Sequence, residues 1–284
     1  GTPRVKEALF QLVLDQGVQQ SQRPQVWRIV AHLDRTLERN QGRYQALLQG
    51  CVLAKDKDAI ELDVARVFCT HHLFRGSTGA TSRQQVKNVL YAFAVRASNI
   101  GYCQGMAYLV ATIYIQFPNE EECFWMFTLL MERQGLSQLY DAKLGNLMDL
   151  CDVTNSCLPD PLRKHLERLA VVPASYIINW YLTLFAGTFA CWDFVMTVWD
   201  MMWLTRPHAM LPLRVVIALH SHFASDILSC EDTGSLILLL QRTLPEALVH
   251  TSALRGKGSI QTLRKRLPSS PILSRLNRRH SRVG

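Results

Sequence analysis

Two short stretches of this sequence combine polar side chains at spacings that could do chemistry. The first holds Asp63 and Arg66 in a segment whose apolar residues recur every three to four positions. On a helix, residues three apart lie within one turn, so the carboxylate can hold the guanidinium through charge-assisted hydrogen bonds and limit its rotamers. The alternative is a solvated ion pair, which contributes about 0–1 kcal/mol. The pair alone leaves both interpretations open.

The second stretch is 100–106, where Gly101 and Gly105 bracket Tyr102 and Gln104. Glycine suits a position where the chain bends or where another backbone approaches closely. An uncharged amide held at such a bend, at the start of a helix, can be directed at a molecule outside the protein. A turn that buries its glutamine is the alternative, and this stretch alone does not exclude it.

Helices are the elements expected to position both stretches. Apolar residues make up 48% of the chain and charged residues 19%, which supplies a core and argues against disorder. The apolar residues recur at helical spacing, without a sustained alternating stretch, a hairpin signal or an internal repeat. We therefore predict an all-α fold of about a dozen helices. The expected helices cover residues 4–16, 24–38, 58–68, 83–98, 106–117, 120–130, 139–156, 159–170, 174–187, 189–204, 210–228 and 232–242, with a loop at 41–57 and a turn-rich break at 76–82.

The net charge of +8 is concentrated at one end of the chain. Nine of the 31 basic residues and no acidic residue lie in 253–284, so residues 1–252 carry 22 basic and 23 acidic residues. We therefore predict one domain over 1–252 and a basic C-terminal tail over 253–284. A nearly neutral body argues against nucleic acid as a partner. The tail could bind an anionic membrane surface or form a solvated, mobile end, and both remain open.

Cysteine and histidine spacing gives no sign of a disulfide framework or a metal site. The eight cysteines are scattered without a C-x-x-C pair, which is typical of reduced thiols in an intracellular protein. The group Cys69, His71 and His72 lacks a second Cys/His pair nearby, so no metal is expected there. The most apolar run, 176–204, contains two aspartates. Because a charge near a bilayer centre costs several kcal/mol, this run is expected to be a buried helix pair.

Three spaced motifs resemble the signatures of the TBC domain family, whose members are GTPase-activating proteins for Rab GTPases. They are, in chain order, Arg23-x-x-x-Trp27, Ile60-x-x-Asp63-x-x-Arg66 and Tyr102-x-Gln104. Residues 100–106, 180–186 and 198–200 are also similar to TBC core segments, and the resemblance covers roughly residues 20–245. Arg23 and Trp27 are four apart and share a helix face, so we expect this pair to be structural.

The resemblance implies a single large multi-helix TBC-type domain that completes the active site of a Rab GTPase in its GTP form. Arg66 would be inserted in trans to neutralise charge on the transferring phosphoryl group, and Gln104 would orient the attacking water. Asp63 would restrain Arg66, Tyr102 would fix the loop of Gln104, and Ile60 would support the motif. The chain would then be an activator rather than an enzyme. It would need no cofactor or metal of its own, because the GTPase carries GTP and Mg²⁺, and it would work in the cytoplasm or peripherally on endomembranes.

The sequence departs from the family pattern close to both motifs. Val67 and Cys69 stand where the family usually has threonine and proline, and Ala107 stands where it usually has asparagine. These departures favour an alternative of a different class, in which a catalytically weak module binds a Rab or another partner as a scaffold or adaptor. Kinetic measurements separate the two hypotheses.

A second alternative is a hydrolase that uses Cys103 or Cys69 as a nucleophile beside His220 or His222. Such a thiol needs a neighbour that stabilises the thiolate, and nothing in the sequence places these residues together. A buried cysteine usually serves as a small apolar residue. Ser221 lies between the two histidines, but a helix would direct these three side chains differently, so a serine nucleophile is not favoured.

Overall fold

The computed structural model describes residues 17–132, 136–140, 144–204 and 210–247. Within these ranges the chain is all-α and holds no strand, as the sequence predicts. The expected helix at 4–16 and the basic tail at 253–284 lie outside the described residues. The elements are α2 (Arg23–Ala31), α3 (Leu33–Arg39), α4 (Arg43–Leu48), α5 (Ala54–Arg66), η1 (His72–Phe74), α6 (Gly76–Arg96), α7 (Met106–Gln116), α8 (Glu120–Glu132), η2 (Leu136–Tyr140), α9 (Gly145–Cys157), α10 (Asp160–Arg168), α11 (Ala174–Leu182), α12 (Trp192–Leu204), α13 (Met210–His222), α14 (Ala224–Ser229), α15 (Thr233–Leu238), η3 (Leu239–Thr243) and α16 (Leu244–Ala247).

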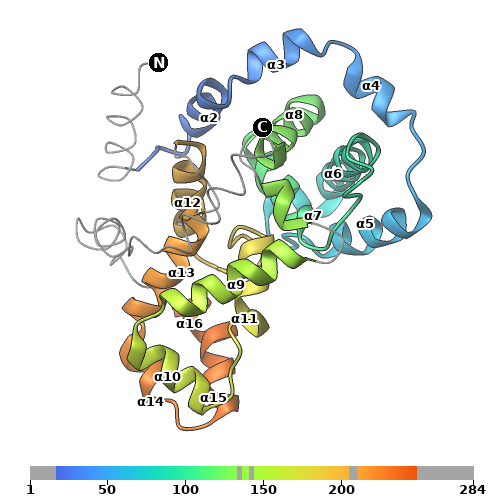
Figure 1. Cartoon of the computed structure of the whole chain (residues 1–284). Coiled ribbons are helices and arrows are strands. Elements are labelled where there is room, and N and C mark those ends of the chain that lie inside the picture. The colour runs from blue at the N-terminus through green and yellow to red at the C-terminus, as the bar shows by residue number, and fades with distance from the viewer. Residues whose placement is uncertain (1–16, 133–135, 141–143, 205–209, 248–284) are drawn as a thin grey trace.

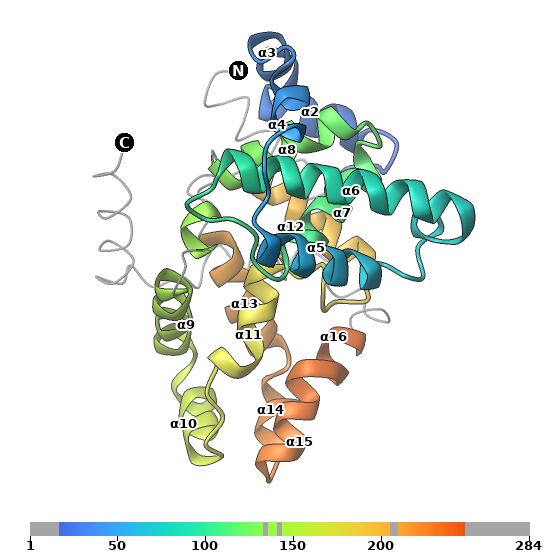
Figure 2. The same cartoon turned by 90° about the vertical axis from the view of Figure 1, so that its right-hand side faces the viewer.

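The described helices are arranged in two halves (Figure 1). Helices α2 to α8 form the upper half, and α10, α14 and α15 lie at the lower end in both views (Figure 2). Helices α11, α12 and α13 run between the halves. The 21-residue helix α6 packs against α4, α5, α7 and α8, so it is the central helix of the upper half.

A core rich in aromatic residues joins the two halves. Trp27, Trp125, Trp180 and Trp199 are each at most 2% exposed. The apolar run 176–204 forms most of α11 and all of α12, so it is the buried helix pair that the sequence predicts. None of the described helices is both long and apolar enough to span a bilayer. The eight cysteines form no disulfide.

The expected helix over 24–38 is divided in two, because His32 takes a left-handed conformation with φ 57°. Its N–H bonds to the carbonyls of Arg28 and Ile29, which ends α2 in a cap usually supplied by glycine. After this break, α2 packs against α12 while α3 packs against α8. The helical spacing of apolar residues continues through such a break, so periodicity alone could not show it.

Two other expected boundaries in the upper half are wrong. The predicted loop at 41–57 contains α4 and the first turn of α5. The predicted break at 76–82 is instead the start of α6, which begins at Gly76 with φ 58°. Glycine, serine and threonine have low helix propensity, but contacts with the preceding segment override that preference here. The segment 76–82 therefore belongs to the helix.

The remaining differences lie in α9 and the helices that follow it. Helix α9 begins at Gly145 rather than at 139, and α11 ends at Leu182, five residues before its predicted end. Leu184 and Phe185 follow it at φ 44° and 69°, which turns the chain toward α12. The expected helix over 210–228 is two helices, α13 and α14.

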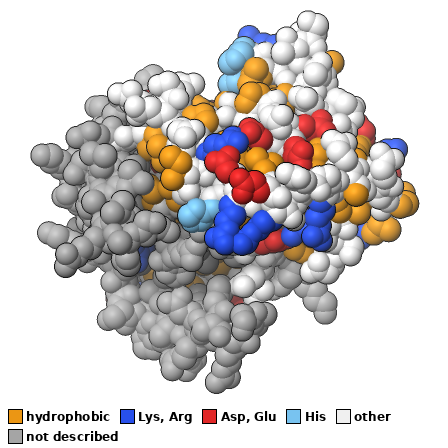
Figure 3. All heavy atoms as spheres, turned by 90° about the horizontal axis from the view of Figure 1, so that it is seen from above, with side chains coloured by type: hydrophobic (Ala, Val, Ile, Leu, Met, Phe, Trp, Pro, Cys, Tyr) orange, Lys and Arg blue, Asp and Glu red, His pale blue; other side chains and the backbone are white. Residues whose placement is uncertain are grey.

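Opposite charges are interspersed on the described surface. Arg28 pairs with Glu122 at 2.7 Å, and Arg96 pairs with Glu132 at 2.9 Å. Figure 3 shows basic and acidic side chains next to one another on the face seen from above. This mixture does not form the continuous basic field typical of a nucleic-acid interface. The absence of a nucleic-acid partner stays a prediction.

The first TBC-like motif, Arg23 and Trp27, connects α2 to α12. Arg23 Nε donates to Asp200 at 2.9 Å, and Trp27 Nε1 donates to the same carboxylate at 2.7 Å. The Trp27 ring also stacks on Trp199 with a centroid separation of 5.9 Å. Burial raises the pKa of Asp200, while the Arg23 bonds and charge and the Trp27 bond act in the opposite direction. Arg23 and Trp27 therefore both bond to the buried Asp200 carboxylate and do not face solvent.

We expect Asp200→Ala to lower the free energy of unfolding by about 3–5 kcal/mol, because it leaves the buried Arg23 charge without its partner. Urea unfolding would measure this loss. Asp152→Ala removes an exposed carboxylate and is the matched control, with an expected change within about 0.5 kcal/mol. Equal losses in the two variants would contradict the anchoring role of Asp200.

A buried histidine lies on α13, between the two halves of the fold. His220 is 0% exposed, its Nε2 lies 2.6 Å from Tyr176 Oη, and its Nδ1 lies 2.8 Å from the Val216 carbonyl. Burial lowers the pKa of His220 from 6.5 to about 4, with the Val216 contact opposing that shift. The folded state therefore favours the neutral ring more strongly than the unfolded chain does.

Below pH 6.5 the unfolded chain binds a proton at His220 before the folded chain does, so stability falls as pH falls. The full contribution is present above pH 6.5 and is lost on the way to about pH 4, a change of roughly 3 kcal/mol. Urea unfolding across this range should show a shallower decline for His220→Gln than for the wild type. The exposed His222→Gln should keep the wild-type slope, and an identical slope in both variants would contradict the assignment.

Candidate functional site

The last turn of α5 presents Arg66 at the surface with a single acidic partner. Arg66 Nη2 donates to Asp63 Oδ1, one turn earlier on the same helix. The Arg66 side chain is 56% exposed, whereas the Asp63 side chain is only 10% exposed. The guanidinium is thus bound by a buried carboxylate, while more than half of the Arg66 side chain remains exposed.

Asp63 also connects α5 to the glycine-bracketed stretch. Tyr102 Oη donates to Asp63 Oδ2 at 2.6 Å, so one carboxylate accepts bonds from both Arg66 and Tyr102. Burial and the bond to Asp63 raise the pKa of Tyr102 well above its usual range. The phenol therefore stays protonated and continues to donate at neutral pH.

Gln104 lies two residues beyond Tyr102 and is exposed. Its side-chain amide makes no hydrogen bond with any described residue. The turn that buries its glutamine, left open by the sequence, is therefore not what the structure contains. The stretch leads directly into α7, which packs against α5. Burial raises the pKa of Tyr108 in the first turn of α7, and the charge of Arg66 opposes that shift.

Both bracketing glycines are required by the backbone. Gly101 has φ 67° and Gly105 has φ 102°. A Cβ at Gly101 would lie 2.7 Å from Asp56 Oδ2, and one at Gly105 would lie 3.2 Å from Leu182 Cβ. The stretch is therefore held against the first turn of α5 at one glycine and against the end of α11 at the other.

The buried face of α5 explains the spacing of the second motif. As whole residues, Asp56, Ile60 and Asp63 are 6%, 0% and 7% exposed, and they recur at intervals of four and three residues. Asp56 contacts Gly101 and Asp63 bonds to Tyr102, so the stretch runs along two turns of this face. Asp56 was not singled out from the sequence, although its seven-residue spacing from Asp63 was a signal that could have found it.

Of the three residues that depart from the family pattern, two are buried and one is exposed. Val67 and Ala107 are both 0% exposed and pack in the core. Cys69 is exposed, and its thiol contacts the carbonyl oxygens of Ala65 at 3.6 Å and Arg66 at 3.3 Å. The two buried departures therefore change core packing rather than the outward surface beside Arg66 and Gln104.

The first motif does not contribute side chains to this site. Arg23 and Trp27 bond to Asp200 in the core, as described above. Of the predicted site residues, the structure connects Arg66, Asp63 and Tyr102 by hydrogen bonds and places Gln104 in the same loop as Tyr102.

The structure does not connect the residues of the hydrolase alternative. His220 bonds to Tyr176 and the Val216 carbonyl, and Ser221 Oγ donates to the Ile217 carbonyl. Burial and the Asp63 charge raise the pKa of Cys103, which is the reverse of what an activated thiolate requires. Among the described residues, no group of three His, Cys, Asp or Glu side chains is arranged to hold a metal ion.

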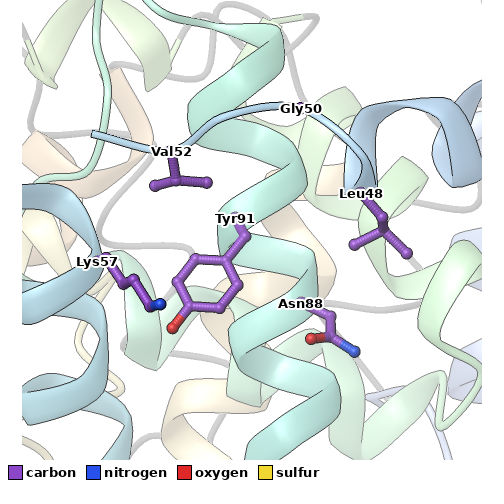
Figure 4. A pocket seen from close by; sticks show the side chains of 6 residues that line it. All are labelled: Leu48, Gly50, Val52, Lys57, Asn88 and Tyr91. Carbon is purple, nitrogen blue, oxygen red and sulfur yellow. The ribbon is translucent and has the colours of Figure 1, made fainter. Parts of the chain in front are cut away.

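A cavity of about 350 Å³ opens beside the other end of α5 (Figure 4). It is lined by Leu48, Gly50, Val52, Lys57, Asn88 and Tyr91. The polar ends of two of these are already used, because Tyr91 Oη donates to Glu61 at 2.7 Å and Asn88 Nδ2 donates to Glu120 at 3.1 Å. The cavity includes neither Arg66 nor Gln104, so the candidate site is an exposed surface rather than a pocket.

An exposed guanidinium and an exposed amide can bind oxygen atoms of another molecule, but they supply no nucleophile. Arginine stays charged and glutamine stays neutral across the physiological pH range, so neither needs a shifted pKa. The arrangement suits stabilisation of an anionic group on a partner, and guanidinium's planar fork matches phosphate oxygens.

Comparison with known proteins identifies related chains. The family model described as Rab-GTPase-TBC domain matches residues 20–228. TBC1 domain family member 4 of Mus musculus is 30% identical over 243 residues, which cover 82% of this chain and 18% of that protein. The chain spans about a fifth of the length of the first curated relatives it matches.

Two solved structures share the fold. The Ypt/Rab-GAP domain of Gyp1p superimposes with a TM-score of 0.74 at 17% identity, over 92% of this chain and 91% of that one. The Chlamydomonas flagellar RabGAP TBC domain superimposes with a TM-score of 0.69 at 22% identity, over 88% and 85% of the two chains. These similarities confirm the TBC-type all-α architecture.

We expect Gly101→Ala to destabilise the fold more than Gly42→Ala, although both glycines have a similar positive φ. Gly42 has nothing within 4 Å of an added Cβ, so its alanine should cost only the left-handed penalty of about 1–2 kcal/mol. At Gly101 the added methyl also meets Asp56, which should add roughly 1–3 kcal/mol. Urea unfolding of both variants measures the difference, and equal losses would show that the contact with α5 is not restrictive.

Proposed function

The chain belongs to the Rab-GTPase-TBC domain family, and we propose that it accelerates GTP hydrolysis by a Rab-family GTPase in its GTP form. The observation that carries this proposal is the pair of exposed side chains, Arg66 and Gln104, on segments joined through Asp63 and Tyr102. The solved neighbours described as Rab-GAP domains support the same class of activity.

In the proposed mechanism, Arg66 enters the nucleotide site of the GTPase and binds oxygens of the transferring phosphoryl group. An arginine supplied in trans to a GTPase contributes roughly 10³–10⁵ in rate. The pairing with Asp63 reduces the number of rotamers that the guanidinium must give up when it docks. Its remaining outward N–H groups are available for the phosphoryl oxygens.

Gln104 orients the water that attacks the phosphorus atom. Its amide has a carbonyl oxygen that can accept a hydrogen bond from the water and an NH₂ group that can donate to a phosphoryl oxygen. Gly101 and Gly105 fix the loop, and the Tyr102 bond to Asp63 ties that loop to the helix of Arg66. The two side chains therefore approach the partner as one unit.

No covalent step takes place on this chain, which is why we propose an activator rather than an enzyme. GTP and Mg²⁺ are carried by the partner GTPase, and this chain supplies positioning and electrostatic stabilisation.

The second candidate is a catalytically weak module that binds a Rab or another partner as a scaffold. The departures at Val67, Cys69 and Ala107 are the observation that favours it. Binding of a Rab without faster hydrolysis would support this alternative. Attachment of the tail 253–284 to anionic lipid is a separate proposal, which vesicle flotation with and without those residues would test.

We expect single-turnover hydrolysis by one or a few members of a GTP-loaded Rab panel to accelerate with the wild-type chain. Arg66→Ala and Arg66→Lys should both lower the rate about 10³-fold or more, because an ammonium lacks the planar fork. Gln104→Ala should come close to the same loss.

Arg39→Ala removes an exposed arginine on α3 and is the matched control, with an unchanged rate expected. Gln104→Ala and Arg39→Ala should unfold at the wild-type urea midpoint within error, since both side chains are exposed. Arg66→Ala leaves the buried Asp63 carboxylate bonded to Tyr102 alone, so this variant should stay folded with a lower midpoint. Full activity in Arg66→Ala would refute the proposed role of this residue.

A further inference from the structure

A second arginine, Arg83 on α6, holds the segment that follows Arg66. Its Nη1 donates to the carbonyl of Val64 at 2.8 Å and to that of Val67 at 3.2 Å. Its Nη2 donates to the Phe74 carbonyl at 2.9 Å. One guanidinium thus binds backbone on both sides of Arg66 and at the end of the segment that leads to α6.

These carbonyls need such a donor. The last carbonyls of an α-helix lack the usual i+4 partner, and the Val64 carbonyl accepts only a long bond of 3.4 Å from the Val67 N–H. The C-terminal end of the helix also carries partial negative charge. Val67 leaves the helix in an extended conformation, so the chain turns away from α5 directly after Arg66. Arg83 satisfies one carbonyl before this turn and one after it, and its positive charge lies at the negative end of α5.

Gly79 places the same segment against α6. A Cβ at Gly79 would lie 2.6 Å from the carbonyl carbon of Phe74 and 2.7 Å from its oxygen, so only glycine allows this approach. Gly79 and Arg83 are four residues apart on α6 and share a face. The Phe74 backbone therefore rests on Gly79 while Arg83 binds its carbonyl. This contact explains why the low-propensity stretch 76–82 is helical.

We propose that Arg83 and Gly79 are positioning residues that fix the direction in which Arg66 leaves α5. This inference rests on the proposed function, in which Arg66 must reach a phosphoryl group on the partner. Neither residue contacts the partner in this proposal, and each acts through the backbone that carries Arg66. A misplacement of about 1 Å at a catalytic group can lower a rate roughly 100-fold.

The test compares Arg83→Gln with Arg96→Gln in single-turnover assays on the Rab that the wild type accelerates most. Arg96 is on the same helix and pairs with Glu132 at 2.9 and 3.1 Å, so its variant loses comparable bonds far along α6 from the Arg66 segment. We expect Arg83→Gln to lower kcat about 10- to 100-fold with KM within about twofold, while Arg96→Gln changes neither. Equal kinetics in the two variants would overturn the proposal.

A second kinetic readout separates positioning from a general loss of structure. Arg83→Gln should weaken binding to the Rab loaded with GDP and aluminium fluoride, which mimics the transition state, but not to the Rab loaded with a non-hydrolysable GTP analogue. Arg83→Lys keeps the charge but has one donor nitrogen where Arg83 uses two, so its kcat should fall between those of the wild type and Arg83→Gln. Equal weakening toward both nucleotide states would assign Arg83 a merely structural role and overturn the proposal.

Hydrogen exchange tests the same inference without any GTPase. Amides of 67–75 should exchange faster in Arg83→Gln and in Gly79→Ala than in Arg96→Gln. Unchanged exchange there would overturn the inference even if a Rab responds to the wild type. Faster exchange with no acceleration of any Rab by the wild type would support the positioning of the segment and reject the proposed function instead.

Discussion

The candidate site depends on one buried carboxylate. Asp63 accepts a bond from the guanidinium of Arg66 and another from the phenol of Tyr102, and its side chain is 10% exposed. A carboxylate taken out of water is costly unless it is paired and hydrogen-bonded. These two donors come from segments 36 residues apart in the chain, so satisfying one carboxylate forces the segments together.

The surrounding fold restrains backbone rather than the outward side chains. Gly101 rests on Asp56 and Phe74 rests on Gly79, and in each contact a Cβ would collide with the neighbour. Arg83 then binds the carbonyls on either side of Arg66. Because these contacts involve the backbone, they fix the positions of the Arg66 and Gln104 Cα atoms. They leave the polar ends of the two side chains unoccupied.

The parts of this site that could be predicted from the sequence are the local ones. The i,i+3 relation of Asp63 and Arg66 and the glycines around Gln104 are visible in the chain, and the structure realises both. Asp56 and Arg83 were missed because their partners lie 45 and up to 19 residues away. The start of α6 was missed for a different reason, because the low helix propensity of 76–82 gives no sign of the close backbone contact between Gly79 and Phe74. Similarly, the break at His32 depends on which helices α2 and α3 contact.

Exposure of Arg66 and Gln104 distinguishes a site that acts on another protein from one that acts on a small molecule. An enzyme pocket buries most of its ligand, whereas these two side chains are exposed. The described cavity excludes both of them, and its Tyr91 and Asn88 are engaged with glutamates. In the proposed mechanism, desolvation of the guanidinium would come from the surface of the partner. The electrostatic effect of Arg66 would therefore be weak in the free protein and would become strong only in a complex, where water is excluded.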